Sequence, residues 1–223
     1  MKARSILIPA GLLTLTAVPA VAGAVRVASL AAGGPVTADN SRFFAMPLPV
    51  VVHIFSATTF LALGAFQFSP GIRRRWPRWH RWAGRVLVPS GITAAGAGLW
   101  MTLFYPHPAM DDFLVPILRL VFGSAMISCL VLGFLAIMRR EVATHRAWMM
   151  RGYAIGMGAG TQVLTAIPWL VLTGGHSATG LPRALLLAAG WVINLAVVEW
   201  WLRRRRGRPA RRVLSFGAEG VTR

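Results

Sequence analysis

Long apolar runs alternate with short polar breaks along the chain. A helix needs roughly 20 consecutive, mostly apolar residues to cross the hydrocarbon core of a bilayer. Six runs of about that length occur, at residues 5–30, 47–68, 86–105, 113–138, 152–173 and 183–202. The breaks carry residues typical of loops, such as Gly33-Gly34-Pro35 and Ser69-Pro70-Gly71. The pattern therefore predicts an all-α, polytopic membrane protein with six transmembrane helices.

The composition agrees with this prediction. Of the 223 residues, 56% are hydrophobic and only 13% are charged, whereas a soluble domain carries about 25% charged residues. The single cysteine, Cys129, excludes a disulfide scaffold and a cysteine-based zinc site. We divide the chain into an N-terminal transmembrane helix with its outer loop (1–46), a five-helix membrane domain (47–202) and a basic cytoplasmic tail (203–223).

Most of the positive charge lies on one side of the predicted helices. Twenty of the 24 Lys and Arg residues lie before the first run, in the loops after the second and fourth runs, and after the sixth. The positive-inside rule then places both termini in the cytoplasm of a bacterial inner membrane. The net charge of +18 is accordingly a topology signal, which favours membrane lipids over nucleic acid as partners.

The first run has a second interpretation. Lys2 and Arg4, an apolar stretch at residues 6–18 and the small residues Ala20-Val21-Ala22 are also typical of a cleaved signal peptide. Cleavage leaves five helices with the same orientation. We favour a retained helix, because a cytoplasmic N-terminus already satisfies the charge rule.

Two basic loops share a pattern. Residues 74–81 read Arg-Arg-Trp-Pro-Arg-Trp-His-Arg and residues 139–146 read Arg-Arg-Glu-Val-Ala-Thr-His-Arg, which is RR-x4-HR at an offset of 65. The same offset pairs Gly91 with Gly156. This predicts two parallel helical-hairpin repeats that form a central four-helix bundle. Chance resemblance between arginine-rich loops is the alternative.

Small residues follow each of these loops. Gly152, Gly156 and Gly160 form a doubled GxxxG in the fifth run, and small residues let helices approach closely in lipid. We expect the third and fifth runs near the centre of the bundle. Their histidines, His80 and His145, are then expected close together at the cytoplasmic surface.

His53 and Arg119 form a second group. Each stands roughly 6–9 Å inside the outer boundary, at 1.5 Å of helix per residue. Ionisable groups at this depth usually face the bundle or a cavity, and the loop residues His107, Asp111 and Asp112 are expected to cap the same pocket. Alternatively, Arg119 snorkels or pairs with Asp112, and His53 makes one interhelical hydrogen bond.

These motifs resemble a family of bacterial multi-pass membrane proteins. The motifs are His53, Gly64-x-x-Gln67-Phe68, His80-Arg81-x-x-Gly84-Arg85 and His145-Arg146-x-Trp148-Met149-x-Arg151. The family is Domain of Unknown Function 2306, and the resemblance covers about residues 47–200. It implies a membrane fold and no established reaction. The motifs also look loosely similar to four-helix membrane cytochromes, in which histidines on facing helices hold b-type haem.

Two functions stay open. The first is a non-enzymatic membrane protein, namely a small transporter, a lipid-binding protein or an assembly factor. It would bind a ligand or lipid headgroup at a set of histidines and arginines: His53, His80, Arg81, Arg119, His145 and Arg146. The second is a redox role with b-type haem held by His80 and His145, or by His53 and His107 with Arg119 beside a propionate. The sequence contains no HExxH, CxxC or G-x-S-x-G motif, which argues against hydrolytic or metal-dependent catalysis.

Overall fold

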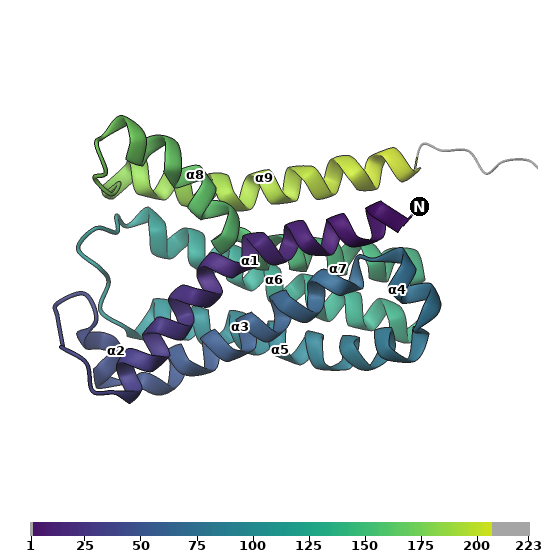
Figure 1. Cartoon of the computed structure of the whole chain (residues 1–223), viewed down its shortest axis with the longest axis horizontal. Coiled ribbons are helices and arrows are strands. Elements are labelled where there is room, and N and C mark those ends of the chain that lie inside the picture. Colours follow the sequence, from purple (N-terminus) through teal and green to yellow (C-terminus); the bar gives the residue numbers. More distant parts are fainter. Residues whose placement is uncertain (1, 207–223) are drawn as a thin grey trace, which may run out of the picture.

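The computed structural model describes residues 2–206, and within them all regular secondary structure is helical (Figure 1). Its nine helices within those residues are α1 (Lys2–Ala31), α2 (Ser41–Ala45), α3 (Pro47–Gln67), α4 (Pro70–Arg75), α5 (Pro77–Phe104), α6 (Leu114–Met138), α7 (Val142–Gly156), α8 (Gly158–Leu172) and α9 (Gly180–Arg206). The predicted tail, residues 203–223, lies largely outside the described residues.

Five of these helices are long and apolar enough to cross a membrane: α1, α3, α5, α6 and α9. The bent pair α7 and α8 passes the same test together, which brings the number of candidate spans to six if the pair is one crossing. The chain is therefore a membrane protein with several apolar helices. The outermost spans are α1 and α9, because only 11% of the most apolar window of each is buried.

Several helices extend beyond the apolar runs that predicted them. The helix α5 begins at Pro77 and α7 begins at Val142, nine and ten residues before the corresponding runs. His80 and His145 consequently lie in the first turns of helices and not in loops. An apolar run marks only the part of a helix that contacts lipid, and a helix can continue with Arg and Trp into the interface.

A buried core joins α3, α5, α6 and α7. Phe60 of α3, Leu87 of α5, Leu130 of α6 and Tyr153 of α7 are all nearly inaccessible to solvent and pack together. Among these four helices the most extensive contacts are α3 with α5, α5 with α6, and α6 with α7, and α7 also contacts α3, where the Tyr153 hydroxyl donates a 2.8 Å hydrogen bond to the carbonyl of Leu61. The helix α1 covers α3 and α8, whereas α9 packs against α6, α7 and α8 (Figure 1).

The expected single helix over residues 152–173 is wrong. The chain breaks at Met157, and α7 and α8 meet there at 47°. Glycine weakens a helix, and Gly156 and Gly158 flank the break. A Cβ at Gly158 would lie 2.3 Å from the indole ring of Trp191, so α9 packs directly against the first residue of α8.

The break also divides the doubled GxxxG. Gly152 packs against Leu130 of α6, and Gly156 packs against Phe60 of α3. Gly160 instead approaches the backbone carbonyl of Leu15 in α1. The three glycines therefore contact three different helices, whereas a straight helix would have aligned them on one face.

An asparagine of α9 satisfies one backbone carbonyl beside the break and is itself held by a threonine of α8. The Asn194 amide donates a 3.1 Å hydrogen bond to the carbonyl of Ala154, and the Thr161 hydroxyl donates a 2.9 Å bond to the Asn194 amide oxygen. An unpaired backbone group costs several kcal/mol in lipid. These contacts between α7, α8 and α9 thus allow a helix to break inside a bundle.

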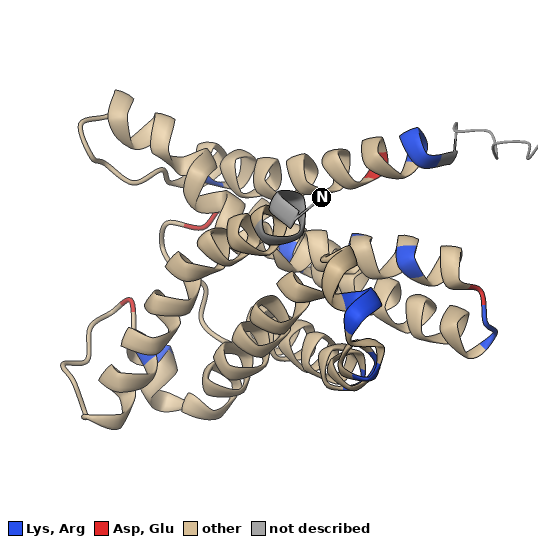
Figure 2. Ribbon diagram, turned by 45° about the vertical axis from the view of Figure 1, so that its right-hand side comes forward, with Lys and Arg blue, Asp and Glu red and all other residues tan. Residues whose placement is uncertain are grey.

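Charge separates the two ends of the bundle (Figure 2). The arginine-rich α4, the turn between α6 and α7, and the last turns of α9 lie at one end, here called the basic end. The opposite end holds α2, the loop between α5 and α6, and the turn between α8 and α9. Both RR-x4-HR loops are therefore at the basic end.

Candidate functional site

His145 is tied to the neighbouring helix of its hairpin. Its Nδ1 lies 2.8 Å from the backbone carbonyl oxygen of Gly133 in α6. A carbonyl only accepts, so Nδ1 carries the proton and the Nε2 of the neutral ring is left with a lone pair. Gly133 permits this closeness, because a Cβ there would meet Met149 at 2.4 Å.

His80 occupies the equivalent place in α5 without the equivalent bond. Its Nδ1 is buried and has no hydrogen-bond partner among the described residues. The offset of 65 maps Gly133 onto Phe68, the residue that follows α3. A bond from His80 Nδ1 to the Phe68 carbonyl would match the bond from His145 to Gly133. Within the described part of the chain, His80 Nδ1 makes no such bond.

A second buried donor is unpaired at the same end. Gln67 is the last residue of α3, and its Nε2 has no partner among the described residues. The short α4 connects the end of α3 to the start of α5, so Gln67 and His80 both lie at the basic end. A buried polar atom without a partner is rare in native proteins and indicates a bound water, ion or ligand.

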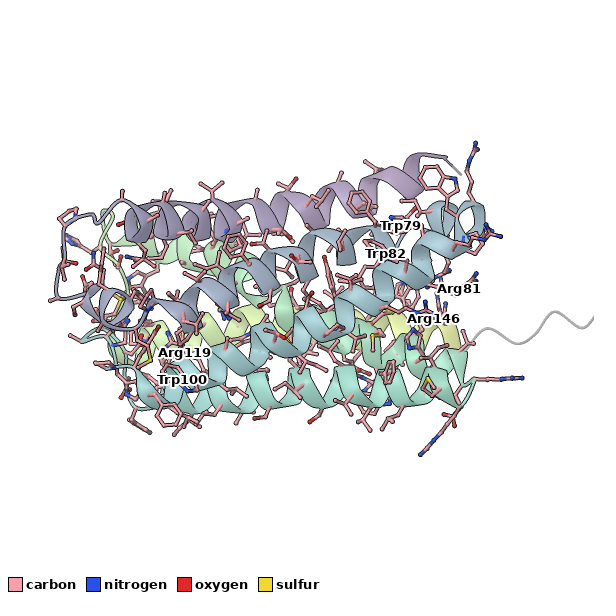
Figure 3. The ribbon with its side chains drawn as sticks, turned by 90° about the horizontal axis from the view of Figure 1, so that it is seen from below. Trp79, Arg81, Trp82, Trp100, Arg119 and Arg146 are labelled. Atoms are coloured by element: carbon pink, nitrogen blue, oxygen red, sulfur yellow. The ribbon has the colours of Figure 1, made fainter. Side chains whose placement is uncertain are left out.

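Arginines surround these groups. His80 lies within electrostatic range of Arg73, Arg81 and His145. Figure 3 shows Arg81 and Arg146 at the same end, beside Trp79 and Trp82. The Arg146 guanidinium lies 5.8 Å from the centre of the Trp201 ring of α9, while Arg81 is exposed.

His53 makes the single interhelical hydrogen bond that one alternative expected. Its Nδ1 lies 2.8 Å from the carbonyl oxygen of Ala94 in α5. Gly98, one turn further along α5, lies beside the ring, and a Cβ there would make an ordinary van der Waals contact with it at 3.5 Å. His53 thus bridges α3 and α5 within the bundle.

Arg119 pairs with Asp111, 2.8 Å away, and not with Asp112. Asp112 instead accepts a 2.6 Å hydrogen bond from the backbone N–H of Phe113. The expectation of an Arg119–Asp112 pair is therefore wrong. Arg183 of α9 binds the other oxygen of Asp111 at 2.7 Å, so one carboxylate holds the starts of α6 and α9.

His107 lies apart from His53. It is exposed in the loop after α5, and its Nε2 lies 3.0 Å from the carbonyl oxygen of Thr102. Thr102 and Ala94 are eight residues apart, about 12 Å along α5. The anchors of the two rings are thus well separated, and the outer histidine pair gains no support from these contacts.

The interpretation of the sequence missed Gln67 and Arg183 as members of these sites. In the sequence Gln67 stood out only as part of the motif Gly64-x-x-Gln67-Phe68, and its position just before the first basic loop was the available signal. Arg183 is one of the four basic residues outside the basic loops and termini, and no pattern in the sequence placed it in a site. Its position in the first turn of the last helix places it at the same end as Arg119.

Comparison with known proteins gives one match. The family described as "Predicted membrane protein (DUF2306)" matches residues 50–202, which is more than half of the chain. No curated protein and no solved structure matches the chain.

Proposed function

The chain belongs to the DUF2306 family of predicted membrane proteins, and we propose that it binds the phosphate headgroup of an anionic lipid at the basic end of its bundle. The site comprises His80 and Arg81 from one HR motif and Arg146 from the other, while His145, whose Nδ1 donates to the Gly133 carbonyl, holds α7 against α6 beside it. The function is that of a lipid-binding membrane protein without catalysis.

One observation carries the proposal. The buried Nδ1 of His80 and the buried Nε2 of Gln67 lack partners among the described residues, at the end where the arginines gather. A phosphate oxygen is a strong acceptor, and it would form charge-assisted hydrogen bonds with the Gln67 amide and with His80 in the tautomer that carries its proton on Nδ1. Arginine is well suited to the same group, since its planar fork binds phosphate with two parallel bonds.

The topology predicted from charge belongs to the same proposal. If α7 and α8 form one crossing, six spans place both termini on the basic side, which the positive-inside rule assigns to the cytoplasm. The inner leaflet of a bacterial membrane presents anionic headgroups to that side. Two parallel hairpin repeats, α3 with α5 and α6 with α7, would bring the two HR motifs to a common site.

Lipid mass spectrometry tests the site. The full-length protein is purified in mild detergent as wild type, as Arg81→Ala plus Arg146→Ala, and as Arg74→Ala plus Arg139→Ala. The second pair is the matched control, because it removes two arginines from the same two loops while sparing the HR motifs. We expect the first pair to lose co-purified anionic lipid and the control to keep it.

His80→Ala separates the specific site from general surface charge. It removes no permanent charge from the loops, so a purely electrostatic surface would bind lipid as before. We expect its loss of bound anionic lipid to approach that of the arginine pair. Equal lipid content in wild type, His80→Ala and the arginine pair would refute the proposal.

The b-type haem alternative has one observation in its favour. The Nδ1 of His145 donates to the Gly133 carbonyl, the contact that metal-binding histidines commonly make with their second ring nitrogen. His145 Nε2 and a nitrogen of His80 would be the iron ligands, and haem would supply electron transfer. An absorption spectrum of protein from haem-replete cells decides this. A Soret band that His145→Ala abolishes would establish haem, and a colourless preparation would discard it.

A further inference from the structure

Four arginines from four helices gather at the end opposite the basic end. Arg26 comes from α1, Arg42 from α2, Arg119 from α6 and Arg183 from α9. Arg119 and Arg183 each bind one oxygen of Asp111, whose side chain is 1% exposed. Both oxygens of the Asp111 carboxylate are therefore paired with an arginine.

Arg26 and Arg42 have no such partner. Both guanidinium groups lie 4.7 Å from the centre of the same Phe43 ring, and neither forms an ion pair with a carboxylate of the described residues. Arg42 makes only a long, 3.4 Å hydrogen bond to the carbonyl of Pro106. The guanidinium groups of Arg26 and Arg42 thus both contact the Phe43 ring, and neither is paired with a carboxylate of the described residues.

The local balance of charge at Arg42 is positive. Partial burial lowers the pKa of Arg42, and the nearby charge of Arg119 lowers it further, while Asp111 and Asp39 oppose the shift. Arg26 also lies close enough to repel it. A guanidinium stays protonated under all ordinary conditions, so an added anion is the means by which this repulsion is relieved.

A cluster of aromatic side chains packs beside Arg26 and Arg42. The rings of Phe43 and Tyr105 pack edge to face at 5.6 Å, and Trp100 packs against Tyr105 at the same distance. Figure 3 shows Trp100 and Arg119 at the same end of the bundle. Immediately after α2, Met46 and Leu48 are 47% and 69% exposed, which places an apolar surface next to the cations.

We propose that Arg26, Arg42 and Arg119 form a second anion site, which binds a phosphate group at the end of the bundle away from the HR motifs. The phosphate belongs either to an anionic lipid of the adjacent leaflet or to a free phosphate ion. Asp111 positions Arg119 toward the site, and Arg183 neutralises Asp111. The site is independent of the lipid site at the basic end.

Binding by the full-length protein in nanodiscs tests the proposal. Wild type is placed in pure phosphatidylcholine, with or without added inorganic phosphate, and in phosphatidylcholine mixed with phosphatidylglycerol. The readouts are the thermal unfolding midpoint and the affinity for phosphatidylglycerol by native mass spectrometry. All measurements are repeated on the Arg81→Ala plus Arg146→Ala background, which removes the proposed basic-end site and so keeps the two proposals distinguishable.

Arg42→Gln and Arg26→Gln are the test variants, and Arg74→Gln, exposed at the basic end, is the control of equal charge. We expect each test variant to weaken binding about fivefold, in line with about 1 kcal/mol per arginine at an anionic surface. Arg74→Gln is expected to change it little on that background.

Each outcome either distinguishes a lipid headgroup from a free phosphate ion or contradicts the proposed anion site. Stabilisation by phosphatidylglycerol alone assigns a lipid headgroup, and stabilisation by inorganic phosphate in pure phosphatidylcholine assigns a free ion. A photoactivatable phosphatidylglycerol provides a readout on the wild type itself, and cross-links near Phe43 are expected. Loss of binding that is equal in Arg42→Gln and Arg74→Gln, or no binding in either lipid, would overturn the proposal.

Discussion

The Nδ1 of His145 donates a hydrogen bond to the backbone carbonyl of Gly133, whereas the Nδ1 of His80 has no partner among the described residues. The two histidines occupy matching places in the RR-x4-HR motifs. His145 joins the two helices of the α6–α7 hairpin, whereas the Nδ1 of His80 is buried without a hydrogen-bond partner among the described residues. This difference gives the two motifs different roles in stability.

Replacement of each histidine by alanine should show that difference. His145→Ala removes a hydrogen bond between helices, and we expect it to lower the free energy of unfolding by about 1 kcal/mol. His80→Ala loses packing but no hydrogen bond from this nitrogen, so a smaller loss is expected in detergent without anionic lipid. Denaturation in mixed micelles measures both values, and an equal loss would contradict the structural assignment.

Gly158 should tolerate no side chain. A Cβ there would lie 2.3 Å from the Trp191 ring, so Gly158→Ala must push α8 away from α9. We expect a loss of about 2 kcal/mol, as for overpacked cores. Gly84→Ala in α5 is the control, because nothing lies within 4 Å of its Cβ position, and it should be neutral or slightly stabilising.

Trp191→Leu offers a second check on this contact. A smaller side chain at residue 191 should recover part of the stability lost in Gly158→Ala, because the clash is with the indole. The same substitution in wild type should destabilise the protein, since the Trp191 ring stacks on Phe122 at 4.6 Å. Additive effects of the two changes would show that the residues do not interact.

Asp111 should matter far more than its neighbour. Asp111→Asn removes the charge that holds Arg119 and Arg183, and breaking a buried ion pair on one side costs roughly 3–5 kcal/mol. Both arginines are partly exposed, so we expect about 3 kcal/mol. Asp112→Asn keeps an oxygen for the Phe113 N–H and should change little. Thermal unfolding in nanodiscs compares the two.

Reporter fusions test the proposed topology. Arg78 lies at the basic end and Asp111 at the opposite end, so reporters at these two places should report different compartments. Reporters after Arg78 and in the tail should agree, with the tail in the cytoplasm. A common compartment for Arg78 and Asp111 would show that the long helix between them does not cross the membrane.

Much of the architecture could be predicted from local properties. The apolar runs of α3, α6 and α9 match helices to within a few residues, because transfer of a helix into lipid depends on its own side chains. Glycine and proline marked the turns, and the arginines marked one end. His53, the Gly64–Phe68 motif and the two motifs at His80 and His145 together indicated the family, which the match over residues 50–202 confirms.

The contacts between helices required the tertiary structure. Two adjacent aspartates offered Arg119 equivalent partners, and only the approach of Arg183 from α9 made Asp111 the shared carboxylate. The glycines of the fifth run indicated close packing, but closeness to Trp191 and Leu15 decided that the helix breaks at Met157.

A multi-span membrane protein with a basic side follows from local sequence alone, since each span and each loop charge acts through its own contact with lipid and water. Which buried polar groups are satisfied depends on the packing of the helices, because a hydrogen bond requires a short distance between atoms from segments far apart in the chain. His145 and His80 share a motif, and the packing of α6 against α7 gave a partner to only one of them.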